Sequence, residues 1–342
     1  MNKNQTSCPS RLGTVGGQAV LEGVMMKAES RVALSVRKTD GTIETEVTEC
    51  RSVREKNAFL RAPIVRGIVN FVEMMILNFK TLNRSAELLG EEEEEPSKFE
   101  KWLDAKLGKS AVALASVIGT ILGVVLSVGL FIVLPAFISD LVARFTDIRI
   151  IKSLVDGLSK ILIFVIYIAL VSLMPDMRRV FEYHGAEHKS IFCHEAGLPL
   201  TPENVKKQSR FHPRCGTSFL FVMMFIGILV SVLYIDVDIR LRIPIKLLVL
   251  PLVVGIGYEF IRYAGKHDNL LVRILSAPGL WIQRLTTKEP DESQIEVAVR
   301  SLKAALPAIY PPEEAVVEAD SESGAESENA KESHADTSEQ EA

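Results

Sequence analysis

The chain has 342 residues, of which 48% are hydrophobic and 24% are charged, and its formal net charge is −4. Residues 313–342 hold 11 Asp or Glu and one Lys, so this tail carries −10 and the chain before it carries +6. The four scattered cysteines and the mixed composition exclude a disulfide-rich secreted domain, a collagen and a coiled coil. The first 14 residues are polar, so we expect no cleaved secretory signal.

Alternating apolar residues near the N-terminus predict a small β element. The segments VALSV (32–36) and TIETEV (42–47) alternate apolar and polar side chains, as half-buried strands do. Asp40 and Gly41 lie between them, and Asp-Gly is a strong signal for a hairpin turn. We therefore expect residues 1–60 to form a cytoplasmic region that contains a β-hairpin.

Two glycines, Gly16 and Gly17, precede the segment QAVLEGVMM. A glycine pair is typical of a tight turn, here one that leads into a strand. A nucleotide-binding loop is the alternative, but the segment lacks both the G-x-G-x-x-G spacing and the lysine of a P-loop. We therefore expect the turn.

Residues 64–89 form an apolar helical pattern interrupted by Arg66, Glu73 and Lys80. The charges argue against a simple membrane span, so we expect this helix to lie in the membrane interface or to re-enter it beneath the other helices. The EEEEEP run that follows is a solvated linker. Residues 61–110 are thus expected to form an interfacial helix and an acidic linker.

Two uncharged stretches predict membrane spans. Residues 111–138 are 28 residues without a charge, and residues 216–235 are 20 residues without one. About 20 apolar residues suffice for a helix to cross a bilayer. We therefore expect both stretches to be transmembrane helices.

Two weaker stretches flank the second of these spans. Residues 161–175 reach membrane length only if their helix begins earlier, where Asp156 and Lys160 stand four residues apart and can pair. Residues 243–261 contain Lys246 near one end, where its long side chain can reach the interface. We expect four spans; the alternative is that the two weaker stretches are buried helices of a soluble fold.

Positive charge in the loops predicts the orientation. The connection 176–215 holds seven Lys or Arg, whereas the connection 236–242 holds two. Since positive loops favour the cytoplasmic side, we expect both termini and the longer connection in the cytoplasm. The predicted fold is a mainly α, polytopic membrane protein with a four-span domain at 111–275, a cytoplasmic segment at 276–312 and a disordered tail at 313–342.

One stretch of the chain concentrates side chains that bind metals. His184 and His188 stand four residues apart, so on a helix they share a face, and Glu187 completes the H-x-x-E-H pattern of a class of zinc proteases. His212 and Cys215 form a second pair three residues apart. The predicted topology brings both pairs to the cytoplasmic ends of spans, so we expect them to converge. The alternative is that they only cap helix ends or pair with nearby Lys and Arg.

Four further groups lie near the same predicted membrane face: Cys193, His194, Glu259 and His267. Ionisable residues at membrane depth are costly and are therefore examined for function. Taken singly, the first three are expected to be structural, and no role is assigned to the fourth.

Five segments carry a further signal: GGQAVLEGVMMKA (16–28), APIVRG (62–67), EYHGAEHKSIFCHEAG (182–197), HPRCGTSF (212–219) and PGLWIQRLTTKEPDESQIEVA (278–298). Together they resemble the YqhQ-type family of bacterial integral membrane proteins, a family of unknown function described as predicted metal-dependent enzymes. The resemblance covers roughly residues 12–310. It implies location in the bacterial inner membrane, a suspected metal, and the motif positions His184, Glu187, His188, His212 and Cys215.

We expect a metal-dependent enzyme, most simply a hydrolase. His184, His188 and one of His212 or Cys215 would hold Zn²⁺ or another divalent metal and leave a position open for water. Glu187 would accept the proton of that water as general base. The substrate would be membrane-associated, either a lipid head group or a peptide near a span, and no nucleic-acid partner is expected.

Two other functions fit the sequence less closely. A closed site with four protein ligands would make the zinc structural and the protein a membrane scaffold or assembly factor. A transporter is the weaker alternative, because the sequence shows no charged or broken-helix site at mid-membrane.

Overall fold

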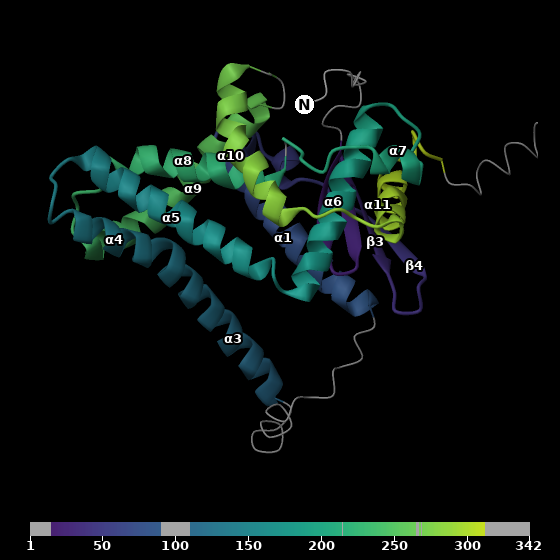
Figure 1. Ribbon diagram of the computed structural model, residues 1–342, viewed down its shortest axis with the longest axis horizontal. Helices are drawn as coiled ribbons and strands as arrows, with labels where there is room; N and C mark the ends of the chain where they lie inside the picture. Colours follow the sequence, from purple (N-terminus) through teal and green to yellow (C-terminus); the bar gives the residue numbers. More distant parts are fainter. Residues whose placement is uncertain (1–14, 90–109, 214, 265–266, 268, 312–342) are drawn as a thin grey trace, which may run out of the picture.

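The computed structural model describes residues 15–89, 110–213, 215–264, 267 and 269–311 (Figure 1). It combines a small sheet flanked by helices with a layer of longer helices (Figure 1). A mainly α fold with an N-terminal β element is therefore confirmed. The acidic linker and the tail at 313–342 lie outside the described residues.

Four antiparallel strands form the sheet in the order β1-β2-β3-β4. They are β1 (Val15–Val20), β2 (Gly23–Ala28), β3 (Arg31–Arg37) and β4 (Ile43–Glu49). The predicted hairpin is the β3–β4 pair, in which the Gly41 amide donates to the Lys38 carbonyl at 2.9 Å. Gly41 adopts φ +87°, a conformation that glycine reaches without strain. Two further strands precede the hairpin, so the sheet is larger than the sequence pattern indicated.

Gly16 and Gly17 lie inside β1, so the turn predicted at this pair is wrong. The chain turns instead between β1 and β2, where Glu22 has φ +47°. Gly17 meets a different requirement, because a Cβ at this position would lie only 2.8 Å from the Glu187 side chain. Glycine inside a strand often marks such a close approach.

The helices fall into two groups. One group lies on or beside the sheet: α1 (Val65–Leu88), α6 (Pro175–Glu195), α7 (Pro202–Lys206) and α11 (Glu292–Ala305), with short 3-10 turns η1 (Val53–Lys56) and η2 (Phe59–Arg61). The other group is called the helical layer below: α3 (Ser110–Val128), the π-helical turn η3 (Gly129–Val133), α4 (Leu134–Val142), α5 (Arg149–Val171), α8 (Gly216–Ser231), α9 (Ile239–Ala264) and α10 (Leu270–Thr286). Helix α1 joins the two groups, because it also packs along α9.

Both faces of the sheet are buried. Successive side chains of a strand point to opposite faces, so Met25 and Met26 enter different cores. Helices α6 and α11 cover one face, where Met26 belongs to the same core as Tyr183 and Ile295. Helix α1 covers the other face, where Leu88 joins the core of Met25. The sheet thus fixes α6 on one side and α1 on the other.

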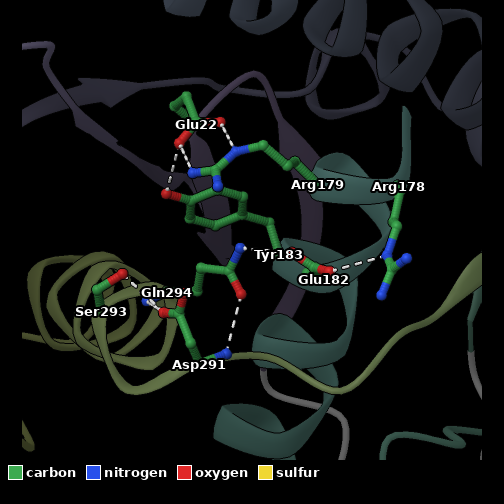
Figure 2. A network of polar contacts seen from close by, with 8 residues as sticks. All are labelled: Glu22, Arg178, Arg179, Glu182, Tyr183, Asp291, Ser293 and Gln294. Atoms are coloured by element: carbon green, nitrogen blue, oxygen red, sulfur yellow. Dashed lines mark hydrogen bonds and ion pairs between the residues drawn. The ribbon is translucent and has the colours of Figure 1, made fainter. Parts of the chain in front are cut away.

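A polar network locks α6 to the β1–β2 turn and to α11, as Figure 2 shows. Arg179 donates through Nε and Nη2 to the two carboxylate oxygens of Glu22, each at 2.5 Å. The Tyr183 hydroxyl donates to Glu22 at 3.2 Å, and the Gln294 side-chain amide donates to Glu182 at 3.0 Å. A bidentate pair between Arg and a carboxylate fixes orientation as well as distance. The network therefore sets the angle of α6 to the sheet.

Among the described residues, two helical segments are long and apolar enough to cross a membrane: Ile118–Val142, which runs from α3 through η3 and α4, and Arg149–Val171, which is α5. Only 11% of either apolar window is buried, so most of these side chains face outward. The predicted span at 161–175 lies mostly in α5, which begins earlier, at Arg149, and ends at Val171. The predicted span at 216–235 is shorter, because α8 ends at Ser231 after 16 residues.

A buried ion pair inside the helical layer differs from the sequence prediction. Asp156 of α5 accepts a hydrogen bond from Lys246 of α9 at 2.5 Å, rather than pairing with Lys160 on its own helix. The side chains of Asp156 and Lys246 are only 3% and 6% exposed, so Lys246 does not extend to an interface. Two charges leave water at lower cost when they meet, which explains why each has the other as its partner.

Gly185 allows α6 to approach the segment that follows α10. A Cβ at this position would overlap the carbonyl oxygen of Lys288, a backbone atom that cannot rotate away. We expect Gly185→Ala to lower the free energy of unfolding by about 1–3 kcal/mol through overpacking. Gly227→Ala on α8, where nothing lies within 4 Å of the added atom, should be neutral or slightly stabilising. Thermal unfolding in detergent measures both variants, and equal melting temperatures would contradict the close packing.

Candidate metal centre

Helix α6 carries the predicted histidine pair. The helix begins at Pro175, whose fixed φ suits the first helical position, and Asp176 in the first turn complements the helix dipole. His184 and His188 follow along the same helix, and their ring centroids lie 4.4 Å apart. The spacing of four residues thus places both imidazoles side by side.

Cys215 joins this pair from a different element. It is the N-cap residue of α8, and its Sγ lies 3.3 Å from His184 Nε2. One ligand atom each from His184, His188 and Cys215 lies within 4.8 Å of the other two. Within the described ranges, this three-residue cluster is the group of His, Cys and acidic residues that could hold a metal ion.

Backbone carbonyls orient both imidazoles of the cluster. His184 Nδ1 lies 2.8 Å from the Thr286 carbonyl oxygen, and His188 Nδ1 lies 2.6 Å from the Arg210 carbonyl oxygen. Since a carbonyl only accepts, each Nδ1 donates, and Nε2 is the nitrogen left available to bind a metal. Metal-binding histidines usually have such a partner behind them. The donor set therefore fits a divalent ion, and thiolate together with imidazole is typical of zinc.

Glu187 reaches the same place. Its Oε2 lies 3.9 Å from His184 Nε2, and its buried side chain packs against Gly17 of β1. Burial raises the pKa of Glu187, and the neighbouring His188 and His184 oppose this effect. The carboxyl group is thus held beside the three-residue cluster without being part of it.

His212 lies close to the cluster but outside it. Its ring centroid is 5.5 Å from that of His188, and its Nε2 lies 3.6 Å from Glu195 Oε2. Gln283 holds the His212 backbone in place, because it accepts from the His212 amide and donates to the His212 carbonyl, both at 2.8 Å. The structure thus brings Cys215, rather than His212, to the His184–His188 pair.

The four further groups named from the sequence have other neighbours. The Cys193 thiol contacts the Pro199 carbonyl, and His194 contacts the Tyr310 hydroxyl. The Glu259 carboxylate accepts from the Arg66 guanidinium, and the His267 ring stacks on the Tyr263 ring. The topology argument that grouped Glu259 and His267 with the metal ligands is therefore not supported by their contacts. The cysteines at positions 50, 193 and 215 are free thiols.

Without a metal, Cys215 and His184 shift each other's ionisation. Burial favours a high pKa for the Cys215 thiol, but the nearby His184 and His188 outweigh burial and hold the pKa well below its usual range. Burial favours a low pKa for His184, but the Cys215 sulfur outweighs it and raises the pKa to about 9. Both shifts favour the ion pair of thiolate and imidazolium over the neutral pair of thiol and imidazole. A metal ion would replace the proton that they share, since the thiolate is the form of cysteine that binds metals.

Sequence reasoning missed the groups that hold these side chains in place. The carbonyls of Arg210 and Thr286 carry no side-chain signal, so no pattern could have identified them. Gln283 has a recognisable signal only in hindsight, as a fully buried amide within an otherwise amphipathic helix. Gly17 was visible as part of a glycine pair, but its role depends on Glu187, which lies 170 residues further along the chain.

Comparison with known proteins places this chain among relatives. Residues 62–308 match the family described as Protein of unknown function (DUF1385). The chain belongs to the DUF1385 family. It is 35% identical over 292 residues to the uncharacterized protein YqhQ of Bacillus subtilis (strain 168), a match that covers 85% of this chain and 92% of that protein. The predicted resemblance is confirmed, and no solved structure matched the chain.

The DUF1385 match contains the whole three-residue cluster. Helix α6, Cys215 and the Thr286 and Arg210 carbonyls all lie between residues 62 and 308, whereas Gly17 precedes this range. The DUF1385 description states no activity, so the chemistry of the site must be argued from its geometry.

The lowered pKa of Cys215 predicts its reactivity after a chelator has removed any metal. Only the thiolate is alkylated, so we expect iodoacetamide to modify Cys215 well below about pH 8.5, where an ordinary thiol ionises. His184→Ala removes the neighbouring positive charge and should move the reaction to higher pH. Cys193, whose pKa burial raises to about 11, should stay unreactive and is the internal control.

Mass spectrometry of peptides labelled across a pH series measures this effect. The expected result is a lower midpoint for Cys215 in the wild type than in His184→Ala. Identical pH profiles for the two proteins would show that His184 does not influence the thiol.

Proposed function

We propose that this protein is a zinc-dependent hydrolase of the bacterial inner membrane, with its centre at the cytoplasmic face. The observation that carries the proposal is a cluster of three metal-binding atoms within 4.8 Å, beside a buried carboxylate that lies 3.9 Å from one of them. Catalytic zinc sites use three protein ligands and keep one position open, whereas structural sites use four. Three ligands with an adjacent carboxylate favour the catalytic kind.

The residues divide into ligands and a base. His184, His188 and Cys215 would hold the ion, which when bound would lower the pKa of a coordinated water to about 7. Glu187 Oε2 takes up a proton beside His184 Nε2 and can return it to a leaving group. Burial raises the pKa of this carboxyl and so strengthens it as a base for that step.

Cys215 is favoured over His212 as the third ligand. The Cys215 sulfur lies 3.3 Å from His184 Nε2, whereas His212 Nε2 faces Glu195 at 3.6 Å. In this proposal His212 supports the ring of His188 from behind and does not bind the ion.

The membrane placement rests on the outward-facing apolar helices. We propose that α8 and α9 cross the bilayer beside the two segments that are long and apolar enough to do so, which makes four spans. The positive loop that contains α6 and α7 then lies in the cytoplasm. A site there suits a membrane-associated substrate, either a lipid head group or a peptide near a span.

Two alternatives keep specific support. His188 is buried and His184 and Cys215 are half-buried, an environment compatible with a structural zinc in a scaffold or assembly factor if a fourth protein group closes the site. A transporter was the weaker alternative because the sequence showed no charged site at mid-membrane. The buried pair of Asp156 and Lys246 places such charges within the helical layer and so supports this alternative. The pair has no contact with the three-residue cluster among the described residues, so it does not bear on the metal chemistry.

Cobalt substitution tests the site. We expect the wild-type protein to bind one Co²⁺ with a thiolate-to-cobalt charge-transfer band, and Cys215→Ser to lose that band. His184→Ala and His188→Ala should lose the metal, whereas Glu187→Gln should retain it, because the carboxamide changes only the proton acceptor. His267→Ala, an exposed histidine outside the cluster, is the matched control. Visible absorption and elemental analysis of the purified proteins measure these outcomes.

The same samples separate catalysis from structure. Cyanide should shift the cobalt spectrum if one coordination position is open, and no shift would indicate a structural site with four protein ligands. Loss of metal from Glu187→Gln would make Glu187 a ligand and remove the base from the proposal. A protein that never holds metal would leave only the thiolate–imidazolium pair of Cys215 and His184.

Cysteine labelling tests the topology. Position 238 lies in the short connection between α8 and α9, and Glu203 lies on α7 and is exposed. We expect Asp238→Cys to react with an impermeant reagent in intact cells and Glu203→Cys to react only after permeabilisation, because the positive loop stays inside. The unsubstituted protein gives the background of native thiols, and the reverse pattern would place the metal centre outside the cell.

A further inference from the structure

The outer face of α10 is apolar although it is exposed. Leu270, Ile274 and Trp281 recur at intervals of four and seven residues, so they share one side of the helix. They are 73%, 58% and 71% exposed. A helix that borders water turns its polar side outward, whereas the buried side of α10 mixes apolar and polar side chains: Val272, Ser276, Ile282, Gln283 and Thr286. This helix is therefore suited to contact a less polar surface than water.

Both charged side chains of α10 are arginines on this exposed face. Arg273 follows Leu270 by three residues, and Arg284 follows Trp281 by three, so each lies beside an apolar member of the face. The Arg284 guanidinium lies over the Trp281 ring, 5.3 Å from its centroid, which keeps a positive charge next to the indole. Since α10 contains no Asp or Glu, its exposed face is both apolar and basic.

Helix α10 crosses α8 at the turn where the proposed span begins. It runs across α8 rather than along it (Figure 1). A Cβ at Gly279 would lie only 2.4 Å from the Cα of Ser218, which is in the first turn of α8. If α8 enters the bilayer from the cytoplasm as proposed, α10 lies at the level of the inner lipid head groups. The inference rests on the proposed function for this placement alone and does not require a metal.

We propose that the exposed face of α10 binds the cytoplasmic surface of the bilayer and selects anionic phospholipids. Leu270, Ile274 and Trp281 enter the boundary between head groups and acyl chains, a depth that tryptophan favours. Arg273 and Arg284 attract lipids whose head groups carry a net negative charge. Helix α10 also packs against α5, whose apolar window is mostly exposed, so its face continues the lipid-facing surface of the helical layer.

A second copy of the chain fits this face less well than a bilayer. In a symmetric dimer the same patch of each subunit meets its equivalent, which would bring Arg273 and Arg284 of one copy toward those of the other. Like charges across an interface are unfavourable. An anionic lipid surface instead complements the arginines while it covers the apolar side chains.

The buried side of α10 contacts the metal centre. The Thr286 carbonyl oxygen lies 2.8 Å from His184 Nδ1, and the Gln283 side chain holds the His212 backbone. One helix therefore links lipid contact on its outer side to the position of the candidate ligands on its inner side.

Tryptophan fluorescence of the full-length protein in lipid vesicles tests the proposal. The chain has two tryptophans, so Trp102→Phe leaves Trp281 as the single reporter. We expect brominated acyl chains to quench Trp281, most strongly when the bromine lies near the head group. In mixed vesicles with one lipid brominated at a time, phosphatidylglycerol should be enriched over phosphatidylcholine about fivefold beside Trp281, the ratio expected for one arginine at an anionic surface. Absence of quenching, or equal quenching by the two lipids, would overturn the proposal.

Variants in the same background test the arginines. Arg273→Gln/Arg284→Gln should abolish the preference for phosphatidylglycerol, whereas Arg284→Lys, which keeps the charge, should retain it. The melting temperature should not change, because both side chains are exposed. Arg300→Gln is the matched control, since it removes the same charge from an exposed position on α11. Each variant is compared with itself in lipid without bromine, because Arg284 affects the fluorescence of Trp281 directly. An unaltered preference in the double variant would contradict the assigned role of the arginines.

Two further outcomes separate this proposal from its alternatives. An unquenched Trp281, together with disulfide-linked dimers of Trp281→Cys, would assign the face to a second copy and overturn lipid binding. A protein that lacks metal but shows the lipid-selective quenching would support this face and overturn only the zinc hydrolase. A protein that binds cobalt and is labelled at Asp238→Cys from outside, but shows no quenching, would overturn only the lipid-binding face.

Discussion

The approach of Cys215 to His184 is the contact on which the arrangement of this molecule depends. His184 stands on α6, which packs on the sheet, whereas Cys215 begins α8 in the helical layer. Their separation of 3.3 Å requires the sheet and the layer to hold one relative position. The Thr286 carbonyl, at the end of α10, meets the other nitrogen of the same imidazole at 2.8 Å and imposes the same requirement. The candidate metal centre is therefore a property of the whole assembly rather than of α6.

Local sequence determines some parts of this arrangement and not others. His184 and His188 meet because an α-helix repeats every 3.6 residues, and the β3–β4 hairpin follows from its own alternation and turn. Which of His212 and Cys215 lies beside the His184–His188 pair is not decided by the local sequence. It depends on Gln283, which holds the His212 backbone from 71 residues away. No spacing between His212 and Cys215 encodes that contact, so the sequence left both as candidates.

Charge pairs were the hardest feature to predict, for an energetic reason. The helical spacing suggested a pair of Asp156 and Lys160, but Asp156 meets Lys246, which is 90 residues away. A pair within one exposed helix contributes only about 0.2–0.5 kcal/mol, whereas a buried charge without a partner costs several kcal/mol. For a buried charge, pairing with an opposite charge from another part of the fold therefore matters more than the spacing of charges along its own helix. Sequence patterns alone identify such charges but not their partners.

The base of the proposed hydrolase depends on a part of the chain that the family match does not include. The DUF1385 match begins at residue 62, whereas Gly17, which leaves room for the Glu187 carboxylate, lies in β1. The 292 residues aligned with YqhQ extend beyond the family match, so that relative shares more of the chain than the family description covers. A segment cut to residues 62–308 would contain the three candidate ligands but lose both the sheet on which α6 packs and the strand against which Glu187 is packed. In the proposed mechanism, the N-terminal sheet therefore serves both steps, because it positions the helix that carries His184 and His188 and leaves room for the carboxylate of Glu187.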